Sequence, residues 1–115
     1  MNPFSEADRL DLMERAAFEA VQKLFSHLPV EHIRKPPRHL MDAKLARQIA
    51  IRIMNVDFNA PRRRITTMQG RQRTSISFAI QTVDRRLENE VFRAAYDRTV
   101  MIAKARYSEE VRKAM

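Results

Sequence analysis

The sequence predicts an all-α domain of five or six helices that carries a helix-turn-helix at about residues 61–88. Apolar residues recur at spacings of three and four along most of the chain, which is the period of amphipathic helices. Only one of the 115 residues is glycine, whereas a β-structure dense in tight turns would need several. The length fits one domain that spans residues 1–115.

The N-terminal segment predicts one long amphipathic helix. Ser5 followed by Asp8 is typical of a helix N-cap with an acidic first turn. The apolar stripe behind it consists of Leu10, Met13, Ala17, Val21, Leu24 and Leu28. Pro29 then interrupts the pattern.

A basic loop separates this helix from a second one. Residues 30–33 predict a single helical turn, and residues 35–38 (Lys-Pro-Pro-Arg) are expected to be extended because a residue before proline avoids the α region. Asp42 is expected to cap the second helix. The apolar positions of that helix are Leu45, Ile49, Ile53 and Val56.

The following segments predict a short helix, a turn and a longer helix. Pro61 suits the first turn of a short helix that runs to about Met68, and Gly70 lies where a tight turn needs a glycine. The longer helix has its apolar stripe at Ile76, Ala79, Ile80, Val83 and Leu87. The same period continues at Phe92, Tyr96, Val100 and Ala103, in a C-terminal helical extension over about residues 89–115. This layout is that of a helix-turn-helix.

Composition disfavours several classes of function. The absence of cysteine excludes disulfides and thiolate chemistry and fits a reducing cytoplasm, where we expect the protein to reside. No apolar run approaches the ~18 residues of a membrane helix, and the acidic residues from Glu6 onward do not fit a signal peptide. With a single glycine the chain has no phosphate loop, so we expect no enzymatic activity and no cofactor.

The histidines and the carboxylate pairs favour structural roles. His27, His32 and His39 are spaced five and seven residues apart and lack cysteine partners, so no metal site is expected. Glu109 and Glu110, like the acidic run at the start of the chain, are most simply solvated helix faces rather than general acid–base pairs.

Positive charge is concentrated in the middle third of the chain. The protein carries 22 Lys and Arg against 14 Asp and Glu, for a net charge of +8. Residues 1–30 have a net charge of −2, residues 31–75 of +8 and residues 76–115 of +2. A surface that serves only solubility mixes its signs, so this concentration indicates a face for phosphates. Together with the helix-turn-helix layout, this concentration of charge predicts double-stranded DNA as the partner.

Two motifs carry a family resemblance. Residues 46–50 (Ala-Arg-Gln-Ile-Ala) and residues 70–76 (Gly-Arg-Gln-Arg-Thr-Ser-Ile) resemble the C-terminal DNA-binding domain of the bacterial chromosomal replication initiator DnaA. That family typically has Ala-Arg-Pro-Arg-Gln and Gly-Gly-Arg-Asp-His-Thr-Thr-Val at these places. Residues 30–33 resemble its short helix before the basic loop, so the similarity covers roughly residues 15–88. The interval between the motifs is one residue shorter here, and we expect the loss in the turn at residues 57–60.

The resemblance implies roles at the matching positions. Arg47 matches a phosphate-contacting arginine, and Arg71 and Thr74 match the family directly. Ser75 replaces a threonine, while Gln72 and Arg73 stand where the family has Asp and His, which implies a different preferred sequence. The chain has no ATPase module, so it resembles a stand-alone relative that regulates replication initiation or transcription, associates with the nucleoid and has replication-initiation proteins as candidate partners.

The expected DNA contacts fall into three groups. Base contacts are expected from the start of the recognition helix, where side chains reach base edges: Arg71, Arg73, Thr74 and Ser75. Phosphate contacts are expected from Lys44, Arg47, Arg62, Arg63 and Arg64. In the basic loop, Arg38 or its neighbour Lys35 resembles the residue that enters the minor groove in the family.

Alternatives remain for these residues and for the function. Arg47 could instead pair with Asp42 or Asp57, and the arginine run 62–64 could be a solvated helix face. The alternative function is a protein-interaction module that acts on the initiator or its regulators through the acidic N-terminal helix, residues 6–28, or through the C-terminal helix.

Overall fold

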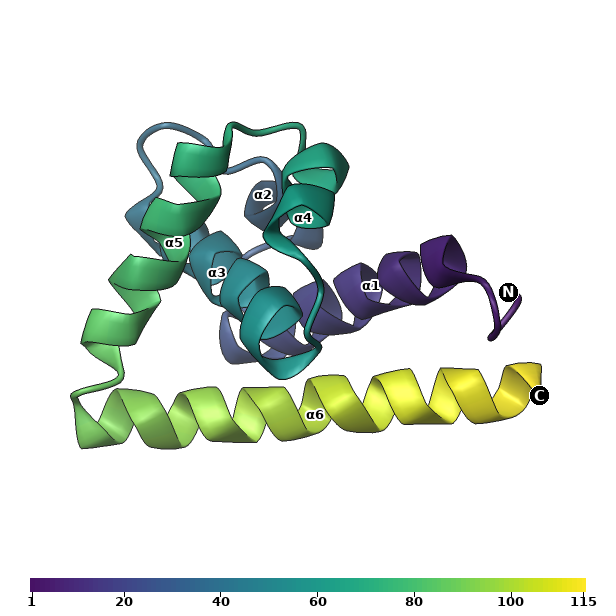
Figure 1. Cartoon of the computed structure of the whole chain (residues 1–115). Coiled ribbons are helices and arrows are strands. Elements are labelled where there is room, and N and C mark those ends of the chain that lie inside the picture. Colours follow the sequence, from purple (N-terminus) through teal and green to yellow (C-terminus); the bar gives the residue numbers. More distant parts are fainter.

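The computed structural model describes all residues 1–115 and confirms the all-α class, with six α-helices and no strand (Figure 1). The elements are α1 (Glu6–Leu24), α2 (Val30–Arg34), α3 (Met41–Arg52), the π-helical turn η1 (Ile53–Asp57), α4 (Arg62–Gln69), α5 (Arg73–Arg86) and α6 (Glu90–Ala114). None of these helices is both long enough and apolar enough to cross a membrane.

The structure confirms the predicted N-cap of α1 but not that of α3. The Ser5 hydroxyl accepts a hydrogen bond from the backbone N–H of Asp8, which confirms the predicted cap of α1. The prediction that Asp42 caps α3 is wrong, because the helix begins at Met41 and Leu40 occupies the cap position, two residues before Asp42. Asp42 therefore lies in the first turn, and its carboxylate is 3.3 Å from the ring of His27.

The second predicted helix changes its winding before it ends. The expected stripe placed Val56 in the core, but the chain widens into η1 after Arg52 and leaves Val56 43% exposed. A π-turn inserts one extra residue per turn and so rotates the following side chains away from the helical stripe. Asn59 then adopts a left-handed conformation with φ of 60°, and the N–H of Ala60 donates to the carbonyl of Met54 at 2.9 Å. This hydrogen-bonded turn ends η1 and leads into α4.

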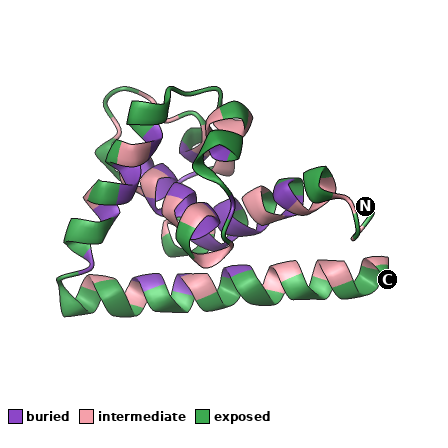
Figure 2. Cartoon of the chain, in the orientation of Figure 1, coloured by how far each residue is buried: buried purple, intermediate pink, exposed green.

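One hydrophobic cluster draws buried side chains from every helix of the chain. Its centre is α3, where Ala43, Ala46 and Ala50 are fully buried beside Ile49. Alanines at these spacings let α1 and α5 approach α3 closely, and α3 packs against both. Figure 2 shows the buried residues on the inward sides of the helices, whereas the α4–α5 turn and the outer side of α6 are exposed.

The C-terminal extension folds back along α1. The predicted apolar period is interrupted at residues 87–89, where Asn89 caps α6 by accepting a hydrogen bond from the N–H of Phe92 at 3.0 Å. The α6 helix then runs beside α1, its most extensive neighbour. The Tyr96 hydroxyl donates to the Asp57 carboxylate at 2.6 Å and fastens α6 to the end of η1.

The α4–turn–α5 unit forms as predicted. Gly70 ends α4 in the left-handed region, with φ of 60° and ψ of 35°. The N–H of Arg71 donates to the carbonyl of Thr66 at 3.2 Å, which satisfies a carbonyl that the end of α4 leaves open. This turn and the basic loop before α3 lie at one end of the molecule, opposite α6 (Figure 1).

Candidate nucleic-acid interface

The N-termini of α4 and α5 carry the wrong charge for helix stability. Neither cap residue, Pro61 or Gln72, makes a side-chain capping bond, and neither first turn contains an acidic residue. The α4 helix instead begins with Arg62, Arg63 and Arg64, and α5 begins with Arg73. A cation at the positive end of a helix is unfavourable by roughly 0.3–1 kcal/mol, whereas an anion is stabilised there. Departures of this kind are typical of functional sites.

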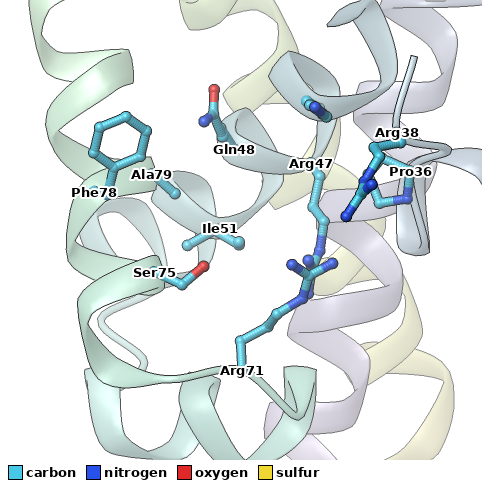
Figure 3. Close-up of a pocket in the computed structure, with 10 residues that line it drawn as sticks. Pro36, Arg38, Arg47, Gln48, Ile51, Arg71, Ser75, Phe78 and Ala79 are labelled. Atoms are coloured by element: carbon cyan, nitrogen blue, oxygen red, sulfur yellow. The ribbon is translucent and has the colours of Figure 1, made fainter. Parts of the chain in front are cut away.

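A groove of about 410 Å³ lies between the basic loop, α3 and the start of α5 (Figure 3). The residues that line it are Pro36, Arg38, Lys44, Arg47, Gln48, Ile51, Arg71, Ser75, Phe78 and Ala79. Four of these side chains are cationic and none is acidic. The groove is therefore a concave surface with an excess of positive charge, which suits a phosphate ligand.

Two of the four cations face each other across the groove. The guanidinium groups of Arg47 and Arg71 point toward one another (Figure 3). Arg47 is only 6% exposed, and burial is the main reason why its pKa is lowered to about 10. The charge of Arg71 lowers this pKa further, while the carboxylate of Glu14 acts in the opposite direction. An anion placed between the two guanidinium groups would relieve the repulsion.

A chain of polar side chains holds Arg47 in this position. Its Nε and Nη2 donate to Oε1 of Gln69 at 3.3 and 2.8 Å. The amide of Gln69 donates in turn to Oε2 of Glu14 at 2.6 Å, and Arg34 lies 3.4 Å from the other oxygen of that carboxylate. Helices α1, α2, α3 and α4 all contribute to this chain. Arg47 is thus oriented before any ligand arrives, which lowers the entropy that binding would cost.

The groove gathers five of the eleven predicted site residues. These are Arg38, Lys44, Arg47, Arg71 and Ser75. Lys35 lines a second hollow of about 510 Å³ beside the α4–α5 turn, which Arg47 and Arg71 also border. The remaining residues, Arg62, Arg63, Arg64, Arg73 and Thr74, lie outside the groove on the exposed beginnings of α4 and α5.

The arginines outside the groove differ in their partners. Arg62 donates to the hydroxyl of Ser77 at 3.1 Å, and Arg64 lies 3.4 Å from the carboxylate of Glu6. Arg63 and Arg73 are exposed and make no ion pair. These two side chains are therefore free to meet a ligand without breaking an intramolecular contact.

The alternative pairing of Arg47 with Asp42 or Asp57 is wrong. Arg47 bonds to Gln69, while the Asp57 carboxylate accepts the hydroxyl of Tyr96. Arg47 is 6% exposed, and its guanidinium reaches Gln69 of α4 instead of either carboxylate. Sequence reasoning could not name Gln69 as the partner because the two residues are 22 positions apart and nothing in their spacing links them.

Five of the ten groove residues received no binding role from the sequence, namely Pro36, Gln48, Ile51, Phe78 and Ala79. Gln48 stands next to Arg47 in the first motif, yet only the arginine received a role. Phe78 lies one helical turn beyond Thr74. It is two positions away from both Ile76 and Ile80, and this spacing places it on the side of the helix opposite the core. That spacing was a usable signal for Phe78. Elsewhere, no group of three or more His, Asp or Glu side chains could hold a metal ion.

Comparison with known proteins found no match: no family model fits the chain, and no curated protein or solved structure is significantly similar to it.

Proposed function

We propose that this protein binds double-stranded DNA with a preference for sequence, through the helix-turn-helix formed by α4 and α5. The observation that carries the proposal is the groove of four cations, free of carboxylates, beside the exposed start of α5. An excess of charge of one sign on a concave surface is costly unless an ion of the opposite sign binds there, and a phosphate backbone supplies such ions at regular spacing.

In this proposal the first turns of α4 and α5 and the cationic groove contact different parts of the DNA. Arg47 and Arg71 clamp one backbone phosphate, with Lys44 beside it, and Arg63 holds another from α4. Arg71, for which the sequence predicted a base contact, is assigned to the backbone here because its guanidinium points toward that of Arg47. The α5 helix, about 21 Å long at 1.5 Å per residue, enters the major groove with its N-terminal residues toward the bases. Arg38 or Lys35 in the basic loop reaches the adjacent minor groove.

The biological role rests on the motif resemblance alone. The protein is proposed to be a stand-alone relative of the DnaA DNA-binding domain, associated with the nucleoid in the bacterial cytoplasm. It would regulate replication initiation or transcription, with replication-initiation proteins as partners. The proposal includes no catalytic step, cofactor or metal.

Titration of an arbitrary duplex at several salt concentrations tests the binding. Each neutralised phosphate contributes about −0.9 to the slope of log affinity against log salt, so ~4–6 contacts predict a slope of about −4 to −5. Arg71→Ala should weaken binding and make the slope shallower by about 1. Its thermal stability should not fall, because the substitution removes a like charge from the neighbourhood of Arg47.

Arg98→Ala is the matched control for this titration. Arg98 is exposed on α6, away from the groove, and makes no ion pair. It should leave both the affinity and the slope unchanged. Binding that is independent of salt, or absent at about 50 mM salt, would contradict the proposal.

The second candidate, a protein-interaction module, is favoured by one observation on α6. Val91 and Met101 are 80% and 71% exposed on this helix, and Met115, which follows its end, is 81% exposed. The acidic face of α1 is a weaker docking surface than its charge suggested. Glu6, Glu14 and Glu19 are already paired with Arg64, Arg34 and Arg106 of the same chain.

A further inference from the structure

Phe78 is an exposed aromatic residue in the middle of the candidate DNA-binding surface. It is 58% exposed and is the only large apolar side chain that is exposed on α4 or α5. Single exposed apolar residues are common on proteins, but this one lines the cationic groove together with Arg38, Lys44 and Arg71. Its position, rather than its exposure alone, calls for an explanation.

The register of α5 places Phe78 on the side that faces away from the core. Thr74, Phe78, Gln81 and Arg85 follow one another at spacings of four, three and four, and all four are exposed. Residues at these spacings form one stripe of a helix. The buried stripe, which contains Ile76, Ile80, Val83 and Leu87, lies on the opposite side.

The surroundings of Phe78 leave room for a ligand next to its ring. Its groove neighbours on α5, Ser75 and Ala79, are small, and Ile51 of α3 adds an apolar floor (Figure 3). The hydroxyl of Thr82 is turned back to the carbonyl of Phe78 at 2.9 Å. A small apolar group could therefore pack against the ring beside Ser75, whereas the rim of the groove is cationic.

We propose that Phe78 is a specificity-determining residue that packs against the C5-methyl group of a thymine in the major groove. The inference rests on the proposed function, because it requires α5 to lie in the major groove of DNA. Among the base edges of the major groove, the thymine methyl is the apolar group on display. The neighbouring Ser75 fits this assignment. A threonine there could pack its own methyl group against the thymine methyl, but serine has no methyl group, so Phe78 would supply the apolar contact.

A protein partner for Phe78 fits the structure less well. Such a partner would have to cover the four cations of the groove together with one isolated aromatic ring. A DNA duplex satisfies both requirements at once, because its phosphates flank the base edges.

Replacing thymine by uracil tests the contact at the level of one methyl group. A preferred site is first selected from a random duplex pool with the wild-type protein. Each thymine of that site is then replaced singly by uracil, and affinities are measured at constant salt. We expect one thymine, or two neighbouring ones, whose replacement weakens wild-type binding about fourfold. That factor corresponds to about 0.8 kcal/mol for one buried methyl-sized group.

Phe78→Ala should abolish this discrimination. The variant should bind the thymine site at least fourfold more weakly than wild type, and it should bind the thymine and uracil duplexes equally at that position. Phe4→Ala is the matched control, since Phe4 is 80% exposed near the N-terminus and does not line the groove. The control should keep the wild-type affinity and the wild-type ratio. Because Phe78 is exposed, its replacement should leave the fold intact, which thermal unfolding checks.

The outcomes separate this inference from the proposed function. Salt-dependent wild-type binding with no effect of uracil at any position overturns the role of Phe78 and leaves DNA binding standing. The same holds if Phe78→Ala retains the wild-type ratio of the thymine and uracil affinities. Failure of the wild-type protein to bind any duplex at low salt overturns both.

Discussion

At the scale of single residues, the arginines of the interface divide into fixed and free side chains. Arg47 is buried and held by Gln69, so its guanidinium presents a set geometry to the groove. Arg63 and Arg73 are exposed and unpaired, so each can adapt to a ligand. A fixed cation suits a phosphate, whose position repeats along any duplex. Arg73, a free arginine at the start of α5, suits a base edge, whose position depends on sequence, whereas the free Arg63 of α4 lies where it can meet the backbone.

Replacing these two free arginines should separate base contacts from backbone contacts. Arg73→Ala should lower affinity for the preferred site by about 1–3 kcal/mol and barely change affinity for random duplex, because a bidentate arginine–guanine contact is lost. Arg63→Ala should weaken all sequences about equally and make the salt slope shallower by about 1. Titrations of the selected and a scrambled site, at several salt concentrations, measure both effects. Uniform losses in both variants would mean that α5 does not read sequence.

At the scale of elements, the turns decide where the interface residues lie. The left-handed Gly70 ends α4 and redirects the chain so that Arg71 borders the groove. Apart from Gly70 itself and its two chain neighbours, no residue has a heavy atom within 4 Å of the position that a Cβ would take at Gly70. The need for glycine is therefore conformational and does not come from crowding. A residue with a side chain would have to adopt the same left-handed angles, which favour glycine.

Gly70→Ala should therefore destabilise the fold by about 1 kcal/mol, because alanine pays the left-handed penalty without a clash. Gly70→Asn should lower the free energy of unfolding by less than Gly70→Ala does, since asparagine tolerates the left-handed conformation better. Asn59 adopts this conformation elsewhere in the chain. Urea unfolding of the three proteins measures the difference. Equal stability of the alanine variant and wild type would show that the turn relaxes to another geometry.

At the scale of the whole molecule, the densest positive charge lies at one end, although Glu6 and Glu14 of α1 pair with Arg64 and Arg34 of the basic segment. The segment with a net charge of −2, residues 1–30, lies mainly in α1 and packs along α6. The segment with a net charge of +8, residues 31–75, contains the basic loop, α4 and the turn, at the opposite end from α6 (Figure 1). A polyanion would approach the basic end first, because the field of the separated charges orients the protein during encounter.

The attachment of α6 through Tyr96 should give a pH dependence of stability. Burial, followed by the hydrogen bond to Asp57, raises the pKa of the Tyr96 phenol above its usual 10.0. Above pH 10.0 the unfolded chain loses this proton while the folded protein keeps it. The unfolded state then binds fewer protons, so the free energy of unfolding falls as the pH rises.

Tyr96→Phe should isolate this contribution. At neutral pH it should cost about 1.5–3 kcal/mol, because the hydrogen bond to a charged carboxylate is lost. The difference from wild type should shrink at about pH 11, where the tyrosine no longer favours the folded state as strongly. Urea unfolding at neutral and alkaline pH measures the change. DNA affinity at neutral pH should be unaltered, because Tyr96 does not line the groove. A difference that is constant with pH would contradict the raised pKa.

The sequence by itself determined the helical class, the Ser5 cap, a helical turn at residues 30–33, which is α2 extended by one residue in the structure, and the α4–turn–α5 unit. These features depend on local rules, namely helical period, capping and the left-handed freedom of one glycine, which act over a few residues. The concentration of positive charge was likewise readable from the chain alone.

Only the tertiary structure decided which of the candidate residues meet. It brought Arg38, Lys44, Arg47 and Arg71 to one groove and turned Arg47 away from both aspartates toward Gln69. It also replaced the last turn of the second predicted helix by η1 and moved Val56 to the surface. These outcomes depend on how α1, α3 and α5 pack, and packing joins residues that are distant in sequence. No local pattern encodes the contact between Gln69 and Glu14, which are 55 positions apart.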